Sequence, residues 1–165
     1  MPQQILTPWL PGFVHWPDPD FGVQRQTPNG LVIHCGSTAA RTAESAMHDG
    51  RNVSYTIAWK ASLGELVQMV SLLDRAYHAG PEGNDWWGLC MPGPWDQDPR
   101  PTEQLAEFTR ALWSLQVAAQ GGLKYWCRHS DIKSTKVDPG PGFDGPFIVA
   151  LERLGVAYRP EGPRG

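Results

Sequence analysis

Cysteine and charge are both scarce in this 165-residue chain, and each scarcity excludes a class of protein. The three cysteines, Cys35, Cys90 and Cys127, are odd in number and widely spaced, which excludes a disulfide framework and a CxxC zinc site. We expect them to be reduced, small and mostly buried. Charged residues make up 19% of the chain and the formal net charge is -3, so electrostatics favours neither nucleic acid nor an anionic membrane as a partner.

Long apolar runs are also missing. No stretch is long enough to span a bilayer, so we expect no membrane insertion. The first nine residues lack the basic and apolar regions of a secretory signal. We therefore expect synthesis in the cytoplasm without an export signal.

Glycine and proline are abundant, with 18 and 16 residues, and they predict long, shaped loops around a modest core. The length predicts one domain, and a hydrophobic content of 41% is typical of a globular chain. We divide the chain into an irregular, Trp-rich arm at 1–29 packed on the core, a main folded domain at 30–155 and a frayed tail at 156–165.

Hydrophobic patterning predicts an α/β fold with a central mixed sheet flanked by helices. The clearest helix spans 101–120, where Leu105, Phe108, Leu112 and Leu115 form one apolar stripe. A second helix is expected from Ser37 or Thr38 to about 48, and a third at 146–154. Strands are expected at 31–35, 53–60, 65–70, 86–91 and 123–127, with a loop or short extended piece at 75–80.

Polar side chains gather in the segment 126–143. It contains His129, Lys136 and Asp138, and the Pro-Gly-Pro-Gly run that follows can form neither helix nor central strand. We therefore expect an ordered loop that carries polar chemistry. Imidazole nitrogen and carboxylate oxygen suit zinc, but a catalytic zinc site usually takes three protein ligands.

Five histidines are candidates for such a site: His15, His34, His48, His78 and His129. A lone histidine is more often a hydrogen-bonded structural residue than a ligand. His34 stands out because it ends a buried strand, where site residues gather in α/β sheets. His48 is expected in the last turn of a helix, where a cation suits the dipole, and His15 on the surface of the arm.

Four motifs occur in order along the chain: Leu-Val-Ile-His-Cys-Gly-Ser-Thr (31–38), Val-Ser-Tyr (53–55), Arg-Ala-Tyr-His-Ala-Gly (75–80), and His-Ser-Asp-Ile followed by Lys-Val-Asp-Pro-Gly-Pro-Gly-Phe (129–143). Together they resemble the type 2 N-acetylmuramoyl-L-alanine amidases of the peptidoglycan-recognition-protein superfamily. The resemblance covers about residues 31–153, and the block at 129–143 is its most specific part.

The resemblance implies a zinc ion held by His34, His129 and Asp138, with Lys136 facing it and Tyr55 at the position of a catalytic tyrosine in phage-lysozyme-type members. The reaction implied is hydrolysis of the lactyl–L-alanine amide of peptidoglycan. Zinc lowers the pKa of a water and polarises the carbonyl. Lys136 would supply charge and Tyr55 a hydrogen bond to the oxyanion, and either could deliver the proton to the amine. Alternatively, Tyr55 is a core residue of an alternating strand and Lys136 a solvated loop charge.

The chain departs from the cytosolic members at one position, because Cys90 stands where they carry a catalytic Glu. We expect His78, Trp86 and Cys90 to contact the muropeptide. A satisfied structural histidine is the alternative for His78. Among Trp86, Trp87 and Trp95, which could form a sugar- or peptide-binding platform, we expect at least one to be core.

Three hypotheses for function follow. The first is a monomeric phage or prophage endolysin that reaches the wall after holin-type release. The second is a cytosolic amidase that recycles soluble muropeptides, which Cys90 argues against. The third is a peptidoglycan-binding module without catalysis, which the retained ligands, Tyr55 and Lys136 argue against.

Overall fold

The computed structural model of the chain describes residues 5, 7–19, 21–24, 27–36, 43–44, 46, 53–93, 102–140, 143 and 145–164. The helix expected from residue 37 or 38 to about 48 lies mostly outside these residues, as does Trp95. Within them, no helix combines the length and apolarity needed to cross a bilayer.

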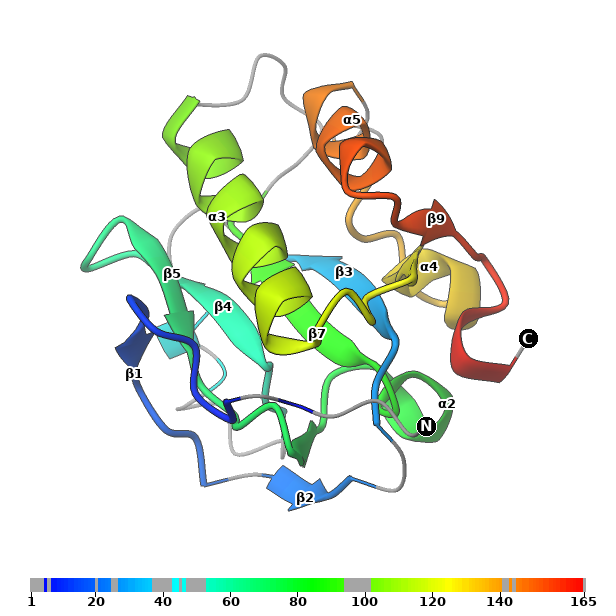
Figure 1. Cartoon of the computed structure of the whole chain (residues 1–165). Coiled ribbons are helices and arrows are strands. Elements are labelled where there is room, and N and C mark those ends of the chain that lie inside the picture. The colour runs from blue at the N-terminus through cyan, green and yellow to red at the C-terminus, as the bar shows by residue number, and fades with distance from the viewer. Residues whose placement is uncertain are drawn as a thin grey trace.

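A mixed seven-stranded sheet forms the centre of the molecule, in the order β1-β5-β4-β7-β3-β8-β9 (Figure 1). The neighbours β4, β7, β3, β8 and β9 pair in parallel, whereas β5 runs antiparallel to β4. The strands are β1 (Val14–His15), β3 (Gly30–Cys35), β4 (Ile57–Lys60), β5 (Glu65–Gln68), β7 (Trp87–Met91), β8 (Tyr125–Arg128) and β9 (Ala157–Tyr158). A separate antiparallel pair joins β2 (Phe21–Val23) to β6 (Asp74–Ala76). The predicted mixed sheet is confirmed.

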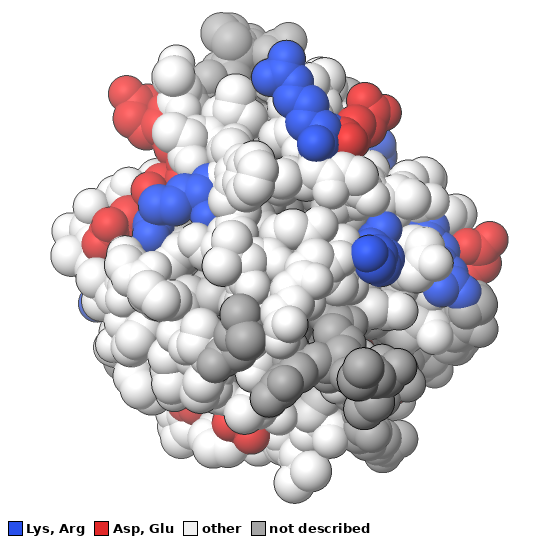
Figure 2. Space-filling view, in the orientation of Figure 1, with Lys and Arg blue, Asp and Glu red and all other residues white. Residues whose placement is uncertain are grey.

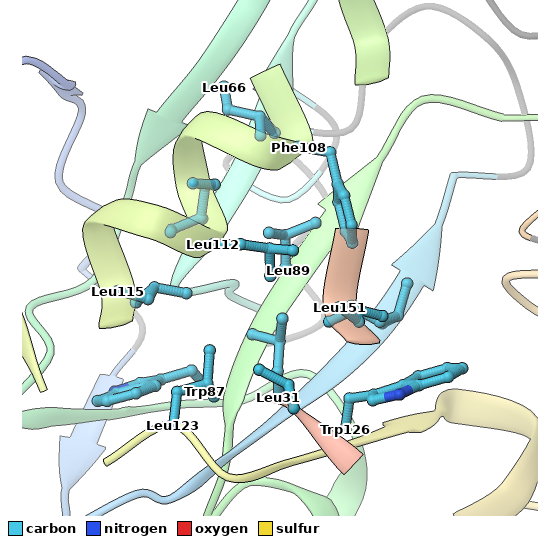
Figure 3. Packing of buried hydrophobic residues seen from close by; sticks show 14 of the residues in the cluster. Leu31, Leu66, Trp87, Leu89, Phe108, Leu112, Leu115, Leu123, Trp126 and Leu151 are labelled. Carbon is cyan, nitrogen blue, oxygen red and sulfur yellow. The ribbon is translucent and has the colours of Figure 1, made fainter. Parts of the chain in front are cut away.

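Two helices, α3 (Thr102–Ala118) and α5 (Pro146–Arg153), lie side by side over one face of the sheet (Figure 1). The predicted apolar stripe of α3 is buried at Phe108, Leu112 and Leu115. These side chains pack on Leu31 and Leu89 of the central strands, as Figure 3 shows. This layer is the main hydrophobic core, and burial of its apolar surface is the principal source of stability.

The opposite face of the sheet carries short elements: α2 (Gly80–Gly83), α4 (His129–Ile132) and the 3-10 turn η2 (Gly162–Arg164). Val32 and Cys127 of the sheet pack there in a small cluster with Ala79 and Trp86. Because side chains alternate along a strand, each central strand contributes to both layers. Ala43 and Ala46, which are also helical, pack with Ala58 and Cys90 in another cluster. Among the described residues, the core under α3 and α5 is therefore separate from the clusters that contain Val32 and Cys90.

Both ends of the chain differ from the prediction. The arm contains two short strands, and β1 pairs with β5 through Val14 and Val67. The tail does not fray, because β9 adds to the sheet beside β8. The missed strands are two or three residues long, too short for a hydrophobic period to reveal them.

Gln68 fastens the arm to the sheet. The backbone amide of Leu10 donates to its side-chain oxygen over 2.6 Å, and its amide nitrogen donates to the carbonyls of Pro8 and Val70. This glutamine is fully buried, so these bonds satisfy polar groups that burial would otherwise leave unpaired.

Charged side chains are interspersed on the face seen in Figure 2. Among the described residues on that face, Lys, Arg, Asp and Glu form small mixed groups with no broad area of one sign. This agrees with the low charge of the sequence, which gives no electrostatic reason for nucleic-acid binding.

Candidate metal centre

His34 lies one residue before the carboxyl end of β3. Alternation along the strand directs Leu31 and Ile33 into the core under α3 and α5, and places His34 on the opposite face with Val32. Its side chain is buried, with 1% exposure. The strand end therefore presents one imidazole to the loops of the second face.

His129 and Asp138 come together because the loop between them closes on itself. The backbone amide of Arg128 donates to the carboxylate of Asp131 over 2.7 Å, which caps the single turn α4. The backbone amide of Ser130 donates to the carbonyl of Asp138 over 3.0 Å. These two bonds start the helical turn at His129 and return the chain to it nine residues later.

Three expected ligands meet at this point. Nδ1 of His129 lies 3.1 Å from each carboxylate oxygen of Asp138, and Nδ1 of His34 lies 3.3 Å from Oδ2. One possible ligand atom from each of the three residues lies within 4.8 Å of the others. The sequence argument placed these residues in one site from separate segments, and the structure brings them together.

Burial and mutual contact set the charges of the group. Burial is the main cause that lowers the pKa of His34 to about 4; His129 and Lys136 add to this lowering, and Asp138 opposes it. Burial alone would raise the pKa of the Asp138 carboxyl, but its close contacts with the rings of His129 and His34 outweigh burial and hold that pKa well below its usual range. At neutral pH the group therefore offers an uncharged imidazole and an ionised carboxylate, the forms that bind metal.

The donor set fits a borderline divalent cation. Two imidazoles and one carboxylate are a common protein contribution to catalytic zinc, with the fourth position left for water. In addition, Nε2 of His129 is buried and has no hydrogen-bond partner among the described residues. The ring therefore has one nitrogen facing Asp138 and one buried nitrogen that no described residue satisfies.

Tyr55 and Lys136 differ in their relation to the three ligands. The Tyr55 ring is half-buried with its centroid 5.2 Å from that of His34, and precedes β4 rather than lying inside a strand. Lys136 is exposed on the ligand loop and close enough to His34 to lower its pKa. Both side chains are thus beside the site: the Tyr55 ring lies against His34, and Lys136 is an exposed residue of the ligand loop.

The three residues expected to contact substrate are all buried. His78, Trp86 and Cys90 have exposures of 7%, 3% and 1%. Trp86 packs in the cluster with Val32, and Cys90 pairs with His34 in the sheet register. In this structure all three side chains pack around the site, and their expected contact with substrate stays a prediction.

The contact between His34 and His78, and the part played by Asn84, were not predicted. Nε2 of His34 lies 2.9 Å from Nδ1 of His78, and Asn84 accepts hydrogen bonds from the backbone amides of His78 and Ala79. The sequence holds one weak signal for Asn84, its place in the turn-like run Gly-Asn-Asp at 83–85. That run indicates a turn without showing which groups it serves.

Comparison with known families gives one match. Residues 24–141 match the sequence model of a family described as N-acetylmuramoyl-L-alanine amidase. The match includes all three candidate ligands as well as Tyr55 and Lys136. No curated protein sequence matches the chain significantly.

Several solved structures share the fold. A selenomethionine derivative of AmpD superposes with a TM-score of 0.72 at 21% identity, covering 92% of this chain and 99% of that one. The endolysin amidase LysCS from Clostridium intestinale gives 0.69 at 18% identity, covering 90% and 99%. Drosophila PGRP-LB in complex with tracheal cytotoxin gives 0.55 at 12% identity, covering 76% and 83%. At these low sequence identities, the comparison shows a shared fold.

Proposed function

Since the chain belongs to the type 2 N-acetylmuramoyl-L-alanine amidase family of the peptidoglycan-recognition-protein superfamily, we propose that it is a zinc-dependent amidase of peptidoglycan. The bond cut is the amide between N-acetylmuramic acid and L-alanine. The observation that carries the proposal is the convergence of His34, His129 and Asp138 on one point, with Tyr55 and Lys136 beside it.

The three ligands would hold the ion, which supplies an acidified water and a polarised carbonyl when bound. Hydrolysis joins the water oxygen to the carbonyl carbon, breaks the C–N bond, and releases the alanine amine with one proton from the water. Negative charge develops on the carbonyl oxygen during this step. Lys136 offers it a positive charge and Tyr55 offers a hydroxyl donor, the kind of fixed group that lowers such barriers.

Tyr55 or Lys136 delivers the proton to the leaving amine in this proposal and is reprotonated by the proton that the attacking water loses. Cys90 is a poor substitute for a carboxylate base, because it is fully buried next to His34. The absence of Glu at this position favours lysis of intact wall, as by an endolysin, over recycling of soluble muropeptides. Holin-type release and a monomeric state remain part of this proposal.

The test is release of free L-alanine amino termini from purified peptidoglycan. Wild type, His129→Ala and a chelator-treated sample are compared, and zinc is then restored to the last. We expect release by wild type, none by the variant or the chelated protein, and recovery with zinc. Binding to peptidoglycan without any release would overturn the proposal in favour of a binding module.

A second assay addresses the biological setting. Intact cell walls and soluble anhydro-muropeptides are offered to the same enzyme at equal concentrations of the scissile bond. We expect faster cleavage of the intact wall. Activity confined to the soluble substrate would make the chain a recycling amidase instead.

A further inference from the structure

His78 forms the middle of a hydrogen-bonded row behind the candidate metal centre. Its Nε2 lies 3.0 Å from the carbonyl oxygen of Trp86, and its Nδ1 lies 2.9 Å from Nε2 of His34. The other ring nitrogen of His34 faces Asp138. The row therefore runs from a backbone carbonyl, through two imidazoles, to the place where the ligands meet.

The carbonyl sets the direction of every bond in this row. A carbonyl oxygen accepts hydrogen bonds and cannot donate them, so Nε2 of His78 carries the hydrogen. In the neutral ring Nδ1 of His78 is then an acceptor, and Nε2 of His34 must donate to it. A neutral imidazole has one hydrogen, which leaves Nδ1 of His34 with a free lone pair toward Asp138.

Asp138 favours the other tautomer of His34. Its carboxylate lies 3.3 Å from Nδ1 of His34, and a carboxylate favours a hydrogen on the nitrogen it faces. Without His78, that hydrogen would occupy the nitrogen that a metal needs. The two neighbours of His34 thus favour different tautomers.

We propose that His78 is a positioning residue that holds His34 in the metal-binding tautomer. The inference rests on the proposed zinc function. It replaces substrate contact as the role of His78, whose side chain is only 7% exposed.

The surroundings of His78 fix its ring. Asn84 accepts from its backbone amide over 2.9 Å and from that of Ala79 over 2.8 Å. Gly88 lies directly against the ring, since a Cβ at this position would be 2.5 Å from Cγ of His78. The amide of Gly88 in turn donates to the hydroxyl of Thr56 over 3.1 Å.

The loop behind the ring is clamped as well. The guanidinium of Arg75 donates to the carbonyl of Pro81 over 2.8 Å and pairs with Asp85 over 3.2 Å. Arg75 therefore contacts both ends of the segment that contains Asn84 and leads to Trp86. A ring held from its backbone, its face and its far nitrogen has little freedom to turn away from His34.

Three substitutions at position 78 separate positioning from packing. In His78→Asn, the amide oxygen can take the place of Nδ1 and accept from His34. His78→Gln can reach the Trp86 carbonyl but leaves no acceptor at the Nδ1 position. His78→Leu fills a similar volume and accepts nothing.

The measurement is zinc affinity by competition with a chromophoric chelator, together with thermal unfolding of each metal-free variant. We expect His78→Leu and His78→Gln to lose about 10–100-fold in zinc affinity, the usual effect of removing a partner of a metal ligand. His78→Asn should stay close to wild type. A packing role predicts the reverse order, because Leu fills the space better than Asn.

His15 provides the matched control. Its Nε2 also lies near a backbone carbonyl, 3.1 Å from that of Leu10, but on β1 at the far edge of the sheet. His15→Leu should leave zinc affinity unchanged. Equal affinity in wild type and His78→Leu would overturn the inference and leave the amidase proposal standing.

The remaining outcomes separate the two proposals. Failure of wild type to bind zinc overturns both. Zinc binding that depends on an acceptor at position 78, in a protein that releases no alanine amino termini, supports the inference and overturns the amidase proposal.

Discussion

The hydroxyl of Tyr158 donates a 2.9 Å hydrogen bond to the carboxylate of Asp131. Tyr158 belongs to the edge strand β9, and Asp131 caps the turn that begins with His129. The end of the chain is therefore tied to the segment that carries a candidate metal ligand.

Removing this hydroxyl should weaken the fold slightly. Tyr158→Phe keeps the ring contact with Trp126, whose centroid lies 4.7 Å away, and deletes only the hydrogen bond. We expect the free energy of unfolding to fall by about 0.5–1.5 kcal/mol, toward the lower end because the pair is exposed. Denaturant unfolding measures it, and a variant as stable as wild type would contradict the expectation.

The same hydrogen bond should make the stability of the fold depend on pH in the alkaline range. Burial and the Asp131 carboxylate raise the pKa of Tyr158 from 10.0 to about 12. The folded protein thus holds this proton more tightly than the unfolded chain, and the resulting stability is complete below pH 10 and lost between 10 and 12. The stability difference between wild type and Tyr158→Phe should shrink over this range. A difference that stays constant with pH would refute the assignment.

Lys136 is expected to act on the reaction rather than on the metal. In Lys136→Met we expect kcat to fall about 10²–10³-fold, the effect of losing one group that stabilises an oxyanion, with zinc affinity nearly unchanged. Lys133→Met is the matched control, because Lys133 is an exposed lysine of the same loop. A similar loss in both variants would mean that general loop charge matters and that Lys136 has no special role.

Tyr55 can be tested by removing one oxygen. Tyr55→Phe retains the ring beside His34 and should preserve folding and zinc binding while kcat drops. A normal kcat together with reduced stability would show that Tyr55 is only a packing residue.

Phe143 should carry much of the stability of the ligand loop. It is fully buried and its ring packs edge-on against Phe108 of α3, with centroids 5.7 Å apart. Phe143→Ala should cost about 3–5 kcal/mol in the free energy of unfolding. Val137→Ala is the control, since Val137 is 86% exposed and the change should stay within about 0.5 kcal/mol. Comparable losses in the two variants would contradict this view of the loop.

The parts of the site that sequence predicted are those with a local signal. A run of β-branched residues ending in His34 indicates a strand with a polar side chain at its end, and the Pro-Gly run after Asp138 indicates a loop. The family followed from four motifs in order and the fold class from hydrophobic patterning, and both are confirmed.

The parts that sequence did not predict depend on register and on contacts between segments. Nothing local shows that Cys90 pairs with His34, or that the ring of His78 points at His34 rather than at a substrate. The strand β9 was missed for a related reason, because Ala157 and Tyr158 pair with β8, which lies about 30 residues earlier in the chain. Such features are properties of the assembled sheet.

The placement of α3 has a practical consequence. This helix covers the sheet face opposite His34, and Val117 on its outer side is 64% exposed. Cys90 and Cys127 are buried and Cys35 is partly so. Val117→Cys would therefore give a reactive handle for coupling the protein to a solid support, oriented with the metal centre turned away from the surface and toward the suspended cell-wall material.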